Sequence, residues 1–170
     1  CLNNAVSDIA DCIVREYTIN DNTLSVAGDI FKYEPDYVAF SCYIWNIDMI
    51  LKISSVLKKA NPKIGIILGG HEVTYNSEEI LREYPFIDAV IRGEGEIPFR
   101  NYLLSIQNGC DIGSLRSVTY RHGGEIIYLP DETMLCDLNN LKFPYDESID
   151  NIIYKIGIKH LINYLTYVLK

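Results

Sequence analysis

The sequence lacks the cysteine patterns that mark a metal site or a disulfide framework. Its five cysteines are odd in number, and no two of them are spaced as CxxC. They are Cys1, Cys12, Cys42, Cys110 and Cys136. A free cysteine packs as a small hydrophobic side chain. We therefore expect buried, reduced thiols and a cytoplasmic protein.

Positive charge and long apolar runs are also scarce. The chain has 15 Lys and Arg against 23 Asp and Glu, a formal net charge of −8, and a pI near 4.8. A nucleic-acid-binding surface needs a basic patch, and a membrane-spanning helix needs about 20 apolar residues. The sequence therefore predicts neither a nucleic-acid partner nor a membrane partner. Its 48% hydrophobic content still suffices for a core within 170 residues.

Strand-like and helix-like patterns alternate along the chain. Residues 13–19 alternate apolar and polar side chains, which predicts a strand. Asn20 to Asn22 supply a turn and a helix cap, and the helix that follows ends before Pro35. Further strands are expected at 37–44, 63–70 and 87–93, further helices at about 47–60, 77–84 and 97–106, and a hairpin at 117–130. Asn46 or Asp48 and Ser77 are the expected caps of the second and third helices.

This alternation predicts an α/β fold with a parallel sheet. The run YVAFSCYI at 37–44 leaves no face for water, as in a strand covered on both sides by helices. We expect residues 1–136 to form one Rossmann-like domain. Residues 137–170 are expected to be a linker and a tail of different composition.

Glycines and polar residues follow the three apolar strands. In an open parallel sheet, ligands bind outside the carboxyl ends of the strands. The segments at that edge would be residues 41–46, 69–74 and 92–96, here called the first, second and third rim loops. Glycine lets backbone approach a ligand without a Cβ atom in between, so these loops predict a binding site for a flat or elongated ligand.

Each feature of the rim loops also has a purely structural interpretation. Gly69 and Gly70 can form a tight turn, and His71 can be a surface residue. The acids of the GEGE stretch at 93–96 can serve a helix dipole, and GEG is not the GxGxxG of nicotinamide cofactors. Trp45 can pack in the core or offer a stacking surface beside Tyr43.

As an ordered set, three stretches resemble the N-terminal cobalamin-binding domain of cobalamin-dependent radical SAM enzymes. They are PDYVAFSCYIWNI at 35–47, the ILGGHEVTYNSEEIL stretch ending at residue 81, and FIDAVIRGEGEIPFRNYL at 86–103. The resemblance covers roughly residues 10–153. It implies a flavodoxin-like Rossmann domain with helices on both faces of the sheet and a corrinoid across its carboxyl edge. The cofactor-binding residues that it implies are Ser41, Tyr43, Trp45, Gly69, Gly70, His71, Glu72, Gly93, Glu94 and Gly95.

Two departures from the family pattern affect this interpretation. The chain has no Asp-x-His-x-x-Gly stretch, so the lower cobalt ligand is unassigned, although the imidazole of His71 suits such a metal. It also has no cysteine after Cys136 and hence no CxxxCxxC. We therefore expect no iron–sulfur cluster, no S-adenosylmethionine site and no catalytic activity from this chain alone.

The first strand of the family's domain also has no counterpart in the sequence. In a flavodoxin-like order that strand is central, so we expect a gap or a new pairing there. We interpret the chain as a truncated or frame-shifted fragment of a radical SAM-type enzyme that binds a corrinoid. The alternative is a non-catalytic Rossmann-like scaffold that has lost its cofactor and self-associates through an exposed sheet edge.

Overall fold

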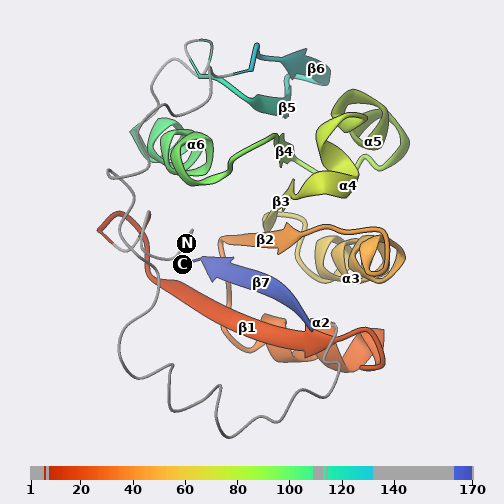
Figure 1. Cartoon of the computed structure of the whole chain (residues 1–170). Helices are drawn as coiled ribbons and strands as arrows, with labels where there is room; N and C mark the ends of the chain where they lie inside the picture. Colours follow the sequence, from red (N-terminus) through yellow and green to blue (C-terminus); the bar gives the residue numbers. More distant parts are fainter. Residues whose placement is uncertain (1–5, 7, 109–112, 114, 132–162, 170) are drawn as a thin grey trace, which may run out of the picture.

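The computed structural model describes residues 6, 8–108, 113, 115–131 and 163–169. Within them, seven strands form one sheet in the order β1-β7-β2-β3-β4-β5-β6 (Figure 1). The strands are β1 (Cys12–Thr18), β2 (Tyr37–Ser41), β3 (Gly65–Gly69), β4 (Ala89–Ile91), β5 (Val118–His122), β6 (Glu125–Tyr128) and β7 (Asn163–Leu169). The longer helices are α2 (Thr23–Phe31), α3 (Ile47–Ala60), α5 (Ser77–Glu83) and α6 (Glu96–Asn108), and α4 (His71–Thr74) is a single turn.

The α/β fold predicted from the sequence is confirmed. Strands β2, β3 and β4 are parallel neighbours, as the βαβ pattern indicates. The hairpin is formed by β5 and β6, which pair antiparallel. Gly123 and Gly124 connect them with φ angles of 59° and 89°. Two successive positive φ angles give the turn whose twist matches that of paired strands.

Helices cover both faces of the sheet. On one face, α2, α3 and α5 contribute Ile30, Ile53 and Leu81 to a core cluster with sheet residues such as Phe40 and Leu68. On the other face, α6 packs Phe99, Tyr102 and Leu103 against Ala39, Ile67 and Ala89. Figure 1 shows α6 across the sheet from α3 and α5. Successive residues of β2 and β3 point to opposite clusters, which explains why their sequences are apolar throughout.

The helix caps agree only partly with the sequence patterns. Asn22 caps α2 as predicted, because its side chain accepts hydrogen bonds from the backbone N–H groups of Leu24 and Ser25. Asn46 precedes α3, but its side chain makes no cap hydrogen bond. Ser77 is also not a cap: Asn76 precedes α5, and the Ser77 hydroxyl pairs with Thr119 at 2.8 Å. The Ser77 hydroxyl thus bonds to a buried partner on a distant strand and not to the helix terminus.

The sheet position where a strand was expected to be missing is occupied by β7. This strand pairs antiparallel with β1 on one side and with β2 on the other. Because β7 opposes both neighbours, β1 runs in the same direction as β2, β3 and β4. The tail thus supplies backbone partners to two strands that would otherwise present unpaired edges.

Two remaining predictions concern membrane-spanning helices and the domain boundary. Among them, no helix is both long enough and apolar enough to span a membrane. The expected domain boundary at residue 136 and the linker after it fall within 132–162, outside the described residues, and the boundary stays a prediction.

Candidate functional site

The first and second rim loops lie against each other at the carboxyl edge of the sheet. Ser41 and Gly69 are register partners at the ends of β2 and β3. One residue further on, the Cys42 N–H donates to the Gly69 carbonyl at 2.7 Å, and the Glu72 N–H donates to the Cys42 carbonyl at 3.4 Å. Backbone hydrogen bonds therefore continue past the strand ends and fix the two loops relative to one another.

Gly70 makes this close approach possible. It has a φ of +99°, and a Cβ atom at this position would lie 2.5 Å from the Cys42 carbonyl oxygen and 2.9 Å from the Cys42 nitrogen. A side chain here would both strain the backbone and collide with it. The structural interpretation of Gly70 is therefore correct: a tight junction of two loops requires it, whatever else the site does.

The third rim loop begins at the same edge. A Cβ atom on Gly69 would lie 3.7 Å from the carbonyl oxygen of Ile91, the last residue of β4. Beyond Arg92, Gly93 has a φ of +65°, and a Cβ atom there would meet no heavy atom within 4 Å. This loop therefore presents backbone at an open surface, and the three loops share one edge as the sequence predicts.

An aromatic pair stands on the first rim loop. The rings of Tyr43 and Trp45 are stacked, with centroids 4.8 Å apart and planes inclined by 4°. Trp45 is 49% exposed and its neighbour Ile44 is 76% exposed. The ring of His71, on the second loop, lies 6.4 Å from that of Tyr43. Trp45 is thus a surface residue rather than part of the core, and it offers a flat apolar face at this edge.

Asn46 holds the first rim loop in place. It is fully buried, its Oδ1 accepts from the Tyr43 N–H at 2.8 Å, and its Nδ2 donates to the Ser41 carbonyl at 3.0 Å. The amide closes the loop that carries the aromatic pair. The sequence does not reveal this role, because an Asn before a helix is more often a cap. Tyr75, just after α4, is 93% exposed.

The predicted site residues fall into a half-buried group and an exposed group. Half-buried are Ser41, Tyr43, Gly69, Gly70, Glu72 and Gly95, whereas Trp45, His71, Gly93 and Glu94 are exposed. The structure brings the residues of the first two loops together and places the third loop at the same sheet edge. Their contact with a ligand stays a prediction.

The site shows neither a reactive thiol nor a built metal centre in the part that is described. Burial raises the pKa of the Cys42 thiol well above its ordinary value, so this cysteine is an inert part of the core. Among the described residues, no group of three or more His, Cys, Asp or Glu side chains could hold a metal ion. The arrangement suits recognition of a ligand by ring stacking and backbone contacts.

A parallel sheet with glycine-rich loops at its carboxyl edge defines a Rossmann-like cofactor-binding domain. The model of the B12 binding domain family matches residues 2–103. This chain therefore belongs to the B12 binding domain family. The match confirms the resemblance seen in the sequence and the prediction of a cobalamin cofactor.

Similar curated proteins include enzymes in which such a domain is one part. An uncharacterized methyltransferase of Pyrococcus horikoshii, PH0819, is 27% identical over 139 residues, covering 81% of this chain and 29% of that protein. The cobalamin-dependent radical SAM methyltransferase TokK of Streptomyces tokunonensis is 30% identical over 113 residues, covering 66% of this chain and 17% of its own length. The chain thus spans less than a third of either relative.

Solved structures share the fold. A structure of the cobalamin-dependent S-adenosylmethionine radical enzyme OxsB, with aqua-cobalamin and S-adenosylmethionine bound, gives a TM-score of 0.57 at 15% identity, covering 68% of this chain and 16% of that one. The radical S-adenosylmethionine methyltransferase TsrM of Kitasatospora setae gives 0.53 at 12% identity, covering 65% and 22%.

The rim loops fit a corrinoid. A broad, largely planar ligand requires an open edge with little side-chain obstruction and an apolar surface to lie against. The open space above Gly93 and the exposed face of Trp45 meet these two requirements. The side-chain Oδ1 of Asn76, after the second loop, is buried without a hydrogen-bond partner. It is an acceptor that the described part of the fold leaves unused.

Proposed function

We propose that the chain is the corrinoid-binding module of a methyltransferase-like, cobalamin-dependent radical SAM enzyme, and that it performs no catalysis alone. The observation that carries the proposal is the placement of the three rim loops at one sheet edge. Two of these loops contain glycines, and the first carries the stacked Tyr43–Trp45 pair, with Trp45 exposed. The family match and the radical SAM relatives support it. A bound corrinoid would supply organometallic group-transfer chemistry, whereas the protein would supply position and surroundings.

Each rim loop has a distinct part in this proposal. The Trp45 ring, held parallel to Tyr43, offers apolar contact to a macrocycle. Backbone at Gly69 and Gly93 can approach ligand amides without obstruction by a Cβ atom. His71 is exposed near Tyr43 and is the described imidazole nearest to these rings, which makes it the candidate for a cobalt ligand.

Titration with hydroxocobalamin tests the proposal. The purified chain is expected to shift the corrin absorption bands with saturation at one equivalent, because protein contacts replace water around the ring. The matched control is a Tyr43→Ala/Trp45→Ala double variant, whose folding is checked by circular dichroism. If a folded wild-type chain at high concentration leaves the corrin absorption bands unchanged, the proposal is ruled out.

The alternative function is a non-catalytic scaffold that no longer holds a cofactor. The observation that favours it is β7, which fills a central position of the sheet antiparallel to both neighbours. Such a scaffold would associate through its remaining edges, those of β1 and β6. A dimer or larger species in analytical ultracentrifugation, unchanged by hydroxocobalamin and accompanied by no cofactor uptake, would select this function.

We further propose that the protein works in the cytoplasm. Cys12 and Cys42 are both free thiols in the described structure, and Cys42 is fully buried. Free thiols are typical of reducing compartments. Fractionation of the source cells with an antibody against the chain tests this location.

A further inference from the structure

Arg92 is a buried cation at the base of the third rim loop. It follows β4 directly and precedes Gly93, and its side chain is only 3% exposed. Burial of a guanidinium group is costly unless its N–H groups find partners. In the sequence, Arg92 is the first residue of a glycine-containing loop and carries no signal of a role.

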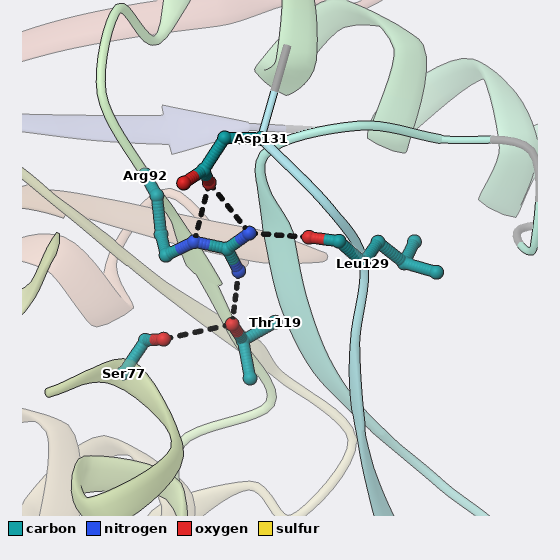
Figure 2. A network of polar contacts seen from close by, with 5 residues as sticks. All are labelled: Ser77, Arg92, Thr119, Leu129 and Asp131. Atoms are coloured by element: carbon teal, nitrogen blue, oxygen red, sulfur yellow. Dashed lines mark hydrogen bonds and ion pairs between the residues drawn. The ribbon is translucent and has the colours of Figure 1, made fainter. Parts of the chain in front are cut away.

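All three guanidinium nitrogens have partners (Figure 2). Nε and Nη2 both donate to Asp131 Oδ1, at 3.0 and 2.8 Å. Nη1 donates to the Thr119 hydroxyl, and Nη2 also donates to the Leu129 carbonyl. The guanidinium carbon lies 3.8 Å from the centre of the Tyr128 ring, a cation–π contact.

The same network includes Ser77, the first residue of α5. Thr119 Oγ1 pairs with the Ser77 hydroxyl at 2.8 Å, so the start of α5 is joined to β5 and to Arg92 (Figure 2). The Arg92 N–H also donates to the Ser117 carbonyl at 2.8 Å. Both the main chain and the side chain of Arg92 are therefore fixed immediately before the loop reaches Gly93.

The network also joins a buried side chain to an exposed one. Arg92 is 3% exposed and Asp131 is 65% exposed. Asp131 lies beyond β6, where the chain leaves the hairpin. The ion pair thus connects the rim of the proposed corrinoid site to the segment that follows the hairpin.

We propose that Arg92 is a positioning residue for corrinoid binding, and that Asp131 couples the third rim loop to the chain beyond β6. The inference rests on the proposed function. Arg92 fixes the direction in which the backbone of Gly93 to Gly95 starts, and a displaced loop would present its N–H groups in the wrong place. The coupling is reciprocal, so a bound corrinoid also stabilises the contact of Asp131 with Arg92.

Hydroxocobalamin titrations of Arg92→Met and Asp131→Asn test the inference. We expect Kd to rise about fiftyfold for Arg92→Met and about fivefold for Asp131→Asn, within the usual range of coupling between sites. At saturation, the corrin bands of both variants are expected to lie closer to those of free hydroxocobalamin. The matched control is Arg82→Met, which removes an exposed arginine that pairs with Glu78 on α5.

Asp131→Asn separates positioning from folding. Nε and Nη2 of Arg92 both donate to one oxygen of Asp131, and the substituted amide keeps an oxygen that can accept from them while the negative charge is lost. The variant is therefore expected to stay folded, as circular dichroism would show, although the affinity falls. This variant carries the test if Arg92→Met does not fold. Wild-type affinity and wild-type corrin bands in Asp131→Asn, and in Arg92→Met if it folds, would overturn the inference alone. A folded wild-type chain that binds no hydroxocobalamin would overturn the proposed function and this inference with it.

Discussion

Tyr43 and Trp45 stack almost parallel on a loop whose shape is set by a third residue, the buried Asn46. The Asn46 side chain bonds to the backbone of both Tyr43 and Ser41. The pair is therefore held by the fold before any ligand arrives. Such preorganisation lowers the entropy lost on binding, which is the property expected of a cofactor platform.

Loss of the Trp45 ring is expected to weaken corrinoid binding. We predict that Trp45→Ala raises the Kd for hydroxocobalamin about tenfold. An aromatic face that the ligand buries contributes on the order of 1–2 kcal/mol to the binding free energy. Trp45→Phe should recover much of the affinity. Phe31→Ala is the control, because Phe31 is 40% exposed at the end of α2. Equal effects of Trp45→Ala and Phe31→Ala would contradict a specific role for the platform.

Gly70→Ala is expected to destabilise the fold. The new Cβ atom would lie 2.5 Å from the Cys42 carbonyl oxygen in a backbone with a φ of +99°, so the free energy of unfolding should fall by about 3 kcal/mol. Gly28→Ala is the matched control: it lies within α2 with no heavy atom within 4 Å of its Cβ position. That substitution should stabilise by up to about 1 kcal/mol. Urea denaturation of the two variants measures both effects, and equal stabilities would show that the loops are not joined as described.

The carboxylate of Asp29 predicts a loss of stability in acid. A hydrogen bond from the Tyr17 hydroxyl, followed by one from Arg15, holds the pKa of Asp29 below its ordinary value near 3.8. A lowered pKa in the folded state stabilises the fold above the unfolded value, and this stabilisation disappears as the pH falls through the folded value. Asp29→Asn should therefore be less stable than the wild type at pH 6, and the difference should shrink below about pH 4.

The control for this pH dependence is Glu125→Gln, an exposed carboxylate in β6. The stabilities of both variants are compared with that of the wild type over the same pH range. A difference for Asp29→Asn that does not change with pH would show that the ionised Asp29 carboxylate does not stabilise the fold.

Removal of β7 is expected to expose two strand edges. A chain ending at residue 162 leaves β1 and β2 without the backbone partners that β7 gives them, and unpaired edges promote association between chains. We predict oligomers in size-exclusion chromatography and a lower urea midpoint. A chain ending at residue 169, which loses only Lys170, is the control. A monomer of unchanged stability after the longer truncation would contradict the pairing of β7.

The local patterns predicted most of the sheet and both helical layers. Apolar runs such as 37–44 and helical periodicity depend on near neighbours in the sequence, and the edge at which ligands bind follows from the direction of parallel strands. The rim loops could be located for this reason. Their residue types suggested a flat ligand, and the exposed Trp45 ring agrees with that prediction.

Contacts between distant residues could not be predicted from such patterns. Ser77 has the ordinary signature of a helix cap, yet its partner is Thr119, 42 residues away. Residues 163–169 pair with residues 12–18, which lie near the opposite end of the chain. In the sequence, Arg92 is indistinguishable from an ordinary loop residue. Its partners come from β5 and from the segment beyond β6. These roles depend on which surfaces meet after folding.

Hydrogen–deuterium exchange with and without hydroxocobalamin tests the central claim most directly. If the three rim loops together hold the corrinoid, amide exchange within residues 41–46, 69–74 and 92–96 slows when the ligand is added. The hairpin turn at Gly123 and Gly124, remote in sequence from these loops, should exchange as before. Protection confined to other segments, or none in any rim loop while hydroxocobalamin binds, would contradict the claim.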